Sequence, residues 1–152
     1  MTCAYDKIYL NNARAVLARM LDFAVYDLGY DIADFFDMFV KSGIAERFEK
    51  GDFEILSGKS GVEVAYEVTD ICGKNKRNVK PRYTANRSEE YWLGWVLAYF
   101  QWETNLTFKE IVKNVPIKEM LLLYTPYHEM DVRQFCDKIK QMFSDGKVLT
   151  SQ

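Results

Sequence analysis

The second half of the chain repeats the pattern of its first half at an offset of 76, in a sequence of 152 residues. At this offset apolar residues coincide, and so do the residues that end and begin helices. The aligned pairs include Leu17 with Leu93, Gly29 with Asn105, and Asp31 with Thr107. Gly and Asn tolerate the left-handed backbone that ends a helix, and Asp and Thr are good caps for the next one. The sequence therefore predicts a duplicated helical unit, an architecture that usually forms binding surfaces rather than reaction centres.

Apolar residues recur at helical spacing along both halves, and no segment sustains the alternation of a strand. We expect one all-α domain of about seven or eight helices. It would comprise the whole of 1–152, with repeat 1 over 11–72, a basic linker over 73–87 and repeat 2 over 88–145. The helix that follows Ser88 is apolar nearly all round, which is typical of a central, buried helix. The segment Asp52–Ser57 is expected to be a loop, because a single strand would have nothing to pair with.

Composition favours a folded protein with an uneven distribution of charge. Hydrophobic residues make up 49% of the chain and charged residues 28%. A chain of this length and composition can bury a core that needs no disulfide or structural metal to be stable. The formal net charge of -2 disfavours a generic nucleic-acid binder. Acids nevertheless dominate from Asp27 to Glu54, whereas the stretch from Gly73 to Arg87 carries basic residues and no acid.

The cysteines and the apolar runs indicate in which cellular compartment the protein is expected to lie. Cys3, Cys72 and Cys136 are odd in number, widely spaced and without a paired motif. This spacing disfavours a disulfide framework or a zinc site and favours thiols in a reducing compartment. The N-terminal residues have no signal-peptide pattern, and no apolar run reaches the about 18 residues of a membrane span. We therefore expect a cytoplasmic protein with no membrane partner.

Patterns that would indicate a nucleophile or a phosphate site are weak. His128 is the single histidine of the chain, so a metal site or an activated Ser or Cys would depend on it. A lone histidine after a Pro-containing turn is most often a cap or a surface residue. The triplet Gly58-Lys59-Ser60 lacks the upstream glycine and the strand of a phosphate loop. We interpret it as a turn that leads to a helix capped by Ser60.

Carboxylates and aromatic residues at helical spacing are likewise interpreted as structural features rather than as binding sites. Asp31, Asp34 and Asp37 fall on one helix face, which we interpret as solvated, with cation binding as the alternative. The aromatic stripe of the helix after Ser88 is interpreted as core rather than as a stacking platform. The sequence accordingly predicts no catalytic residue, no metal ligand and no cofactor.

The two charged segments are the candidate partner-binding regions. A clustered basic run can contact a phosphate backbone or an acidic protein surface, and a solvated linker is the alternative interpretation. The acidic stretch can pair with a basic partner or imitate nucleic acid. The candidate residues are Lys74, Lys76, Arg77, Lys80, Arg82 and Arg87 of the basic loop, and Glu46, Glu49, Asp52 and Glu54 of the acidic stretch.

Three stretches carry a resemblance to a known family: Phe35-Phe36-x-x-Phe39-x-x-Ser42-Gly43-Ile44-Ala45, Ser60-Gly61-Val62-Glu63 and Ser88-Glu89-Glu90-Tyr91-Trp92-x-Gly94-Trp95. From Tyr5 to about Phe135 the chain resembles small uncharacterised proteins of gut Firmicutes. The first half is also similar to a shorter, single-unit family encoded in the same operons. Those operons commonly encode a protein that resembles an ADP-ribosyltransferase toxin. The resemblance implies a toxin–antitoxin or defence cassette, and it brings no established catalytic residues.

Together, the repeat, the uneven charge and the resemblance predict a protein without enzymatic activity. We expect a binding module of the antitoxin, immunity or accessory type that binds and neutralises a partner protein, either a toxin or a defence effector. Two alternatives remain open. One is a phage-encoded, anti-CRISPR-like inhibitor of a bacterial defence system that uses the acidic face. The other is a nucleic-acid-binding regulator that uses the basic loop 74–87.

Overall fold

The computed structural model describes residues 2–74, 81 and 87–150, and their side chains as far as Asp145. Ten α-helices and one 3₁₀-helix lie in this described part of the chain, which contains no strand. The elements are η1 (Lys7–Tyr9), α1 (Leu10–Tyr26), α2 (Ile32–Lys41), α3 (Ile44–Glu49), α4 (Phe53–Leu56), α5 (Gly61–Ile71), α6 (Glu89–Thr104), α7 (Phe108–Asn114), α8 (Ile117–Leu121), α9 (Tyr124–Tyr127) and α10 (Val132–Thr150). The all-α fold class is confirmed.

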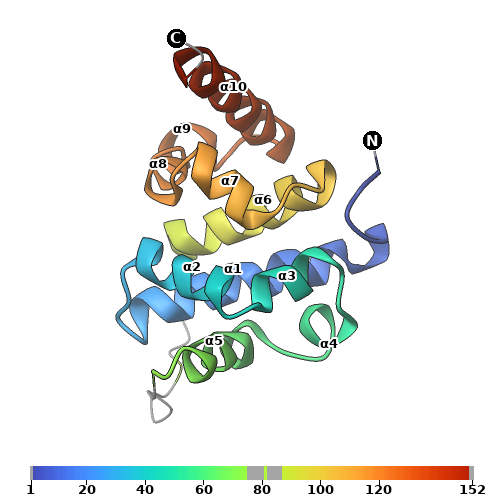
Figure 1. The fold of residues 1–152 in the computed structure, drawn as a ribbon, viewed down its shortest axis with the longest axis vertical. Coiled ribbons are helices and arrows are strands. Elements are labelled where there is room, and N and C mark those ends of the chain that lie inside the picture. The colour runs from blue at the N-terminus through green and yellow to red at the C-terminus, as the bar shows by residue number, and fades with distance from the viewer. Residues whose placement is uncertain (1, 75–80, 82–86, 151–152) are drawn as a thin grey trace.

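Two long helices, α1 and α6, pack side by side through the middle of the molecule (Figure 1). Their backbones come close at Ala18 and Gly94, where a Cβ added to Gly94 would lie 2.5 Å from the Ala18 Cα. Glycine therefore permits this approach, because any side chain at position 94 would push the helices apart. On the same seam, the Arg14 guanidinium lies 4.2 Å from the centre of the Trp95 ring and its Nε donates to the Trp95 carbonyl at 2.9 Å.

The other helices cover this central pair. α5 runs along α1 on the side away from α6, with α2 and α3 across the front, whereas α7 to α9 cover α6 and α10 extends beyond them (Figure 1). The start of α5 is packed tightly, since a Cβ added to Gly61 would lie 2.6 Å from the Met20 nitrogen of α1. Within the described part of the chain, none of these helices is long and apolar enough to cross a bilayer.

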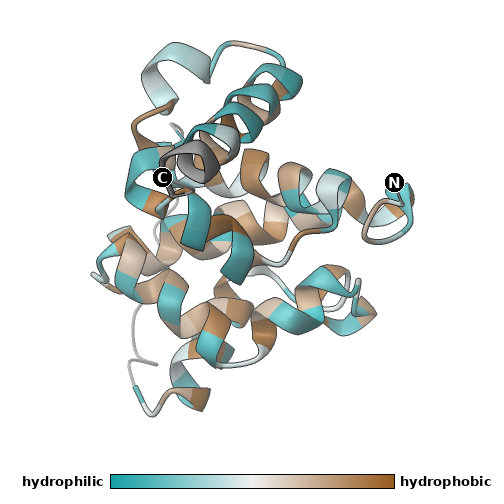
Figure 2. Ribbon diagram, turned by 45° about the horizontal axis from the view of Figure 1, so that its top comes forward, coloured by the Kyte–Doolittle hydropathy of each residue, from teal (hydrophilic) through white to brown (hydrophobic). Residues whose placement is uncertain are grey.

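One buried hydrophobic cluster runs through both halves, and the brown segments of the ribbon face inward between the helices (Figure 2). Phe108 of α7 is fully buried at its centre. Its ring centroid lies 5.7 Å from that of Phe36, 5.5 Å from that of Phe39 and 5.5 Å from that of Phe48. Because Phe108 comes from the second half and its three partners from the first, this aromatic cluster makes the two halves share a core.

Helix boundaries follow the local capping chemistry that the sequence predicts. Asp31 caps α2 and accepts from the backbone N–H groups of the first turn, and Thr107 caps α7 in a capping box with Glu110. Ser88 caps α6, which ends at Asn105 in the left-handed conformation with φ 56°. The predicted caps at Asp31 and Thr107 are confirmed.

The expected count of about seven or eight helices is wrong for the described residues, because one-turn helices replace predicted irregular segments. The segment Asp52–Ser57, predicted to be a loop, holds α4. Asp52 caps it by accepting from the Glu54 N–H, and Ile55 and Leu56 are buried on its inner side. A second one-turn helix, α9, includes Thr125 and Pro126. Burial of Ile55 and Leu56 stabilises α4, and a segment of four residues is too short to show a helical period in the sequence.

Both halves pass through α-helices in the same order, α1 to α5 and then α6 to α10. Contacts across the halves are reciprocal, because α2 contacts α8 and α3 contacts α7. The last helix of each half packs on the long helix of that half, since α5 lies along α1 and α10 contacts α6, where the Phe135 and Phe143 rings meet those of Trp92 and Phe100 (Figure 1). The superposition of 11–72 on 88–145 stays a prediction.

Candidate functional site

A groove opens where the two halves meet, and we call it the inter-half groove. It lies between α2 and α3 on one side and the end of α6, α7 and the start of α8 on the other, and its volume is about 830 Å³. Its lining is largely apolar and includes Ala33, Phe36, Val40, Leu106, Val112 and Ile117. The charged residues along it are Asp37, Lys41, Glu46, Glu49, Lys50 and Lys109.

Most charges at the rim of the inter-half groove are neutralised by a neighbour on the same helix. Lys41 pairs with Asp37 at 2.8 Å on α2, and Lys50 pairs with Glu46 at 2.7 Å beside α3. These four side chains are exposed, so the pairs contribute little stability. Lys109 lies exposed on α7. The rim therefore gives the groove a polar edge around an apolar interior.

Glu49 is the exception among these charges, because it is partly buried and bonded across the groove. Its Oε2 accepts the backbone N–H of Phe108 at 2.6 Å, which ties α3 to the first turn of α7. Burial raises the pKa of the Glu49 carboxyl, and the hydrogen bond from the Phe108 N–H opposes this rise. Glu46 and Glu110 raise the pKa a little further, and Lys50 lowers it. A carboxylate has further lone pairs with which to accept hydrogen bonds.

Gln101 of α6 lines the same groove, and its side chain is completely buried. Its Nε2 donates to the Leu106 carbonyl at 3.0 Å, which fixes the orientation of the amide. Oε1 then accepts no hydrogen bond from the described residues. A buried acceptor without a donor costs about 1–3 kcal/mol, so this oxygen is an unusual feature of the groove wall.

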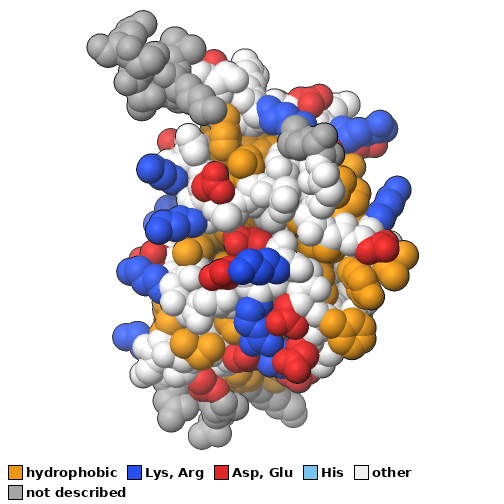
Figure 3. Space-filling view, turned by 45° about the vertical axis from the view of Figure 1, so that its right-hand side comes forward, with side chains coloured by type: hydrophobic (Ala, Val, Ile, Leu, Met, Phe, Trp, Pro, Cys, Tyr) orange, Lys and Arg blue, Asp and Glu red, His pale blue; other side chains and the backbone are white. Residues whose placement is uncertain are grey.

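Basic side chains are interleaved with the acidic candidates that lie outside the groove. Arg47 bonds Asp52 at 2.9 Å, Glu54 at 3.0 Å and Glu67 at 3.3 Å, and Lys59 also pairs with Glu67. The Arg47 guanidinium lowers the pKa of the Asp52 carboxyl. On the face in Figure 3 acidic and basic side chains are interleaved, with hydrophobic side chains beside them. Of the four acidic candidates, Glu46 and Glu49 line the groove and the other two belong to this Arg47 cluster.

Of the six candidate residues in the basic loop, the two outermost, Lys74 and Arg87, are among the described residues. Lys74 lies exposed after α5, and Arg87 lies exposed before α6 with its guanidinium 4.7 Å from the centre of the Tyr91 ring. The other four candidates of this loop, Lys76, Arg77, Lys80 and Arg82, lie outside the described residues.

The remaining candidates for chemistry have local structural roles. The Nδ1 of His128 lies 2.8 Å from the Tyr124 carbonyl oxygen, and the two rings stack at 4.2 Å. Asp31 caps α2 and also pairs with Lys118 at 2.8 Å, and this lysine lowers the pKa of the Asp31 carboxyl. Among the residues with described side chains, no three His, Cys, Asp or Glu are gathered closely enough to hold a metal ion.

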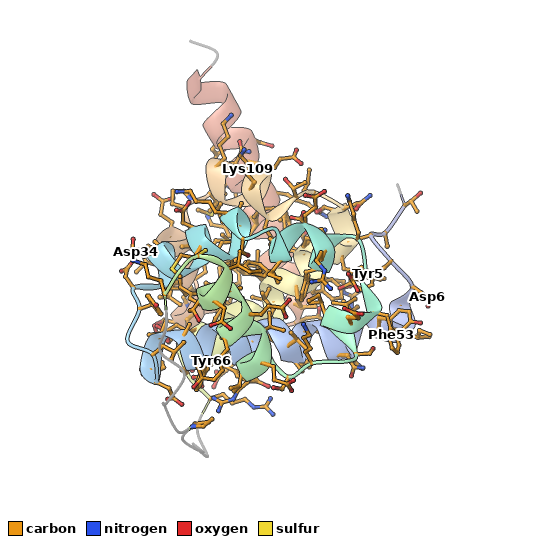
Figure 4. The ribbon with its side chains drawn as sticks, turned by 60° about the horizontal axis from the view of Figure 1, so that its bottom comes forward. Tyr5, Asp6, Asp34, Phe53, Tyr66 and Lys109 are labelled. Carbon is orange, nitrogen blue, oxygen red and sulfur yellow. The ribbon has the colours of Figure 1, made fainter. Side chains whose placement is uncertain are left out.

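A second exposed surface is small and apolar. Ile8 is 75% exposed and Phe53 is 63% exposed, and the Phe53 ring packs edge-on against Tyr9. Figure 4 shows Phe53 near Tyr5 and Asp6, at a distance from the labelled Lys109 of α7. This patch is therefore separate from the inter-half groove.

The sequence indicates Glu46 and Glu49 but not Gln101, which lies in the apolar pattern of a buried helix. The available signal was that Gln101 is the single amide side chain between Tyr91 and Trp102. An amide in such an apolar run needs partners when it is buried.

Comparisons of the chain with protein-family models, curated proteins and solved structures find no match. What the fold and the site define is an all-α protein with a mostly apolar groove at the junction of its halves. The family resemblance stays a prediction.

Proposed function

We propose that this protein is a non-catalytic binding module that holds and neutralises a partner protein, in the manner of an antitoxin or immunity protein, and that the inter-half groove is its binding site. The observation that carries the proposal is the groove itself, an apolar channel of about 830 Å³ bounded by helices and edged with charged side chains. Apolar grooves between helices typically receive an amphipathic helix of a partner, whose apolar side chains enter while polar ones meet the rim. The three cysteines are free thiols, which fits a protein that works in the reducing cytoplasm.

We include in this proposal that the two halves are copies of one unit, related by an approximate twofold axis. The close approach of α1 and α6 supports it, because Ala18 and Gly94 are equivalent positions at the offset of 76. The reciprocal contacts of α2 with α8 and of α3 with α7 are those of a twofold interface. Equivalent residues also face the groove, as Phe36 and Val112 do. The binding site would then have arisen at the junction of the copies.

Co-expression with the protein encoded beside the gene tests the proposal, with co-purification and rescue of growth as readouts. Val112→Glu places a charge in the groove lining and should abolish the complex. Val62→Glu is the matched control, because Val62 is also partly buried but lies on α5 outside the groove. Loss of the complex with both variants, or with neither, would contradict the assignment of the groove.

The charged segments supply a second comparison. One variant neutralises Lys74, Lys76, Arg77, Lys80 and Arg82, and the other replaces Glu46, Glu49, Asp52 and Glu54 by their amides, which keep the capping and backbone hydrogen bonds. If binding uses the groove rim, the amide variant should slow association and remove its salt dependence. Loss of binding with the basic-loop variant, together with salt-sensitive binding to generic DNA, would instead favour the nucleic-acid-binding regulator.

A further inference from the structure

Two hydrogen-bond acceptors lie together at one end of the inter-half groove. Gln101 Nε2 donates to the Leu106 carbonyl, and Glu49 Oε2 accepts from the Phe108 N–H, so both side chains flank the same short turn into α7. Both also line the groove. The Oε1 of Gln101 is buried and accepts nothing from the described residues. At this end of the groove, therefore, Glu49 presents a partly buried carboxylate, and beside it the buried Gln101 Oε1 still lacks a hydrogen-bond donor among the described residues.

The electrostatic surroundings favour a positively charged donor. The side chains that act on the Glu49 carboxylate are Glu46 and Glu110, which repel it, and Lys50, which attracts it. Lys50 already forms an ion pair with Glu46 at 2.7 Å, so its positive charge offsets little of the repulsion that Glu46 and Glu110 exert on the Glu49 carboxylate. A cation that entered the groove would relieve this deficit.

We propose that the inter-half groove receives a partner-protein segment that inserts one arginine, with apolar neighbours, between Gln101 and Glu49. An arginine fits because its planar guanidinium carries five N–H donors and is weakly hydrated, so it can bond a carboxylate and an amide oxygen at once. Its alkyl stem and the neighbouring apolar side chains pack on Val40, Leu106 and Val112. The inference rests on the proposed function and adds the chemistry of the partner.

Benzamidinium is the probe for this site, because it joins an apolar ring to a planar cationic group of N–H donors. Titration into the ¹⁵N-labelled protein should give saturable shifts of the Gln101 side-chain amide and the Phe108 backbone amide, with a dissociation constant on the order of a millimolar. Benzamide, which has the same shape without charge, should bind more weakly, and benzoate weakest. Equal binding of benzoate, or shifts confined to amides outside the groove, would overturn the proposal.

Two substitutions test the hydrogen-bond acceptors while they leave the shape of the groove unchanged. Gln101→Met keeps the size of the side chain and removes Oε1, and Glu49→Gln keeps an acceptor for the Phe108 N–H and removes the charge. Each should weaken benzamidinium binding about tenfold, the loss expected for a hydrogen bond to a charged group. Glu129→Gln is the control, because Glu129 is 88% exposed and does not line the groove. If Gln101→Met does not fold, Glu49→Gln decides alone.

The complex with the co-expressed partner distinguishes the source of the cation. Benzamidinium should compete with the partner, and Arg→Gln scanning of the partner should find one position that weakens the complex about tenfold or more. If the complex forms but no arginine matters and the probe does not compete, this inference fails and the proposed function stands. If the probe binds the groove but no complex forms, the partner and the proposed function fail together.

Discussion

Gly94→Ala is the sharpest test of the seam between α1 and α6. An added Cβ would lie 2.5 Å from the Ala18 Cα, 2.6 Å from the Ala18 nitrogen and 2.7 Å from the Leu17 carbonyl carbon. These are backbone atoms of α1, which cannot rotate away as a side-chain tip could, so the two helices have to separate. Overpacking costs about 1–3 kcal/mol and occasionally more, while alanine returns about 1 kcal/mol of helix propensity.

Separation of the helices also loosens the fully buried contacts on either side, among them those of Leu17 and Leu97. Because the clashing atoms are backbone, we expect the cost of overpacking to lie at the upper end of its range, which leaves a net loss of about 2 kcal/mol in the free energy of unfolding, measured by urea denaturation with circular dichroism. Ala15→Gly is the control, because Ala15 is exposed on α1 and should lose about 1 kcal/mol by propensity alone. A Gly94→Ala protein as stable as the wild type would refute the close approach of the helices.

Three further changes test the core, the groove and the histidine. Phe108→Ala should cost about 3–5 kcal/mol in urea denaturation, because the ring is fully buried among aromatic partners from the other half; a loss below about 1 kcal/mol would contradict the shared core. Burial raises the pKa of Glu49, so the native protein binds this proton more tightly than the unfolded chain and loses stability as pH rises through the window above the ordinary carboxyl pKa. Glu49→Gln should accordingly gain stability relative to wild type as pH rises above the ordinary carboxyl pKa of about 4, and a difference independent of pH would count against this burial. His128→Ala should change the unfolding free energy by less than about 0.5 kcal/mol and leave partner binding intact, whereas loss of function in a folded variant would favour a catalytic imidazole.

The parts of the fold that the sequence predicts well are those decided within a few residues. Asp31, Ser88 and Thr107 act on backbone N–H groups of the next turn, so their capping role depends on local spacing alone. Local sequence patterns do not predict the one-turn helix α4, because four residues are too few to show a helical period. Its stability comes from the burial of Ile55 and Leu56 against other helices.

The candidate site was predictable only in part, because it is made by contacts between distant segments. Glu46 and Glu49 stand out as acids in a charged run, but nothing local shows that one is exposed and paired while the other reaches α7. Gln101 acquires its significance from its neighbours in space, since only the folded chain sets its Oε1 in the wall of a groove.

The position of Glu49 connects the stability of the fold to the proposed binding site. Its hydrogen bond to the Phe108 N–H spans the groove, and Phe108 is also the residue around which the aromatic core of the two halves is built. A cation that binds Glu49 would stabilise the charged form of the carboxyl and with it the contact between α3 and α7. Ligand binding should therefore stabilise the folded protein by an amount that grows with the logarithm of the ligand concentration above the dissociation constant. Under the proposed function, the partner would in this way stabilise the protein at the junction of its two halves.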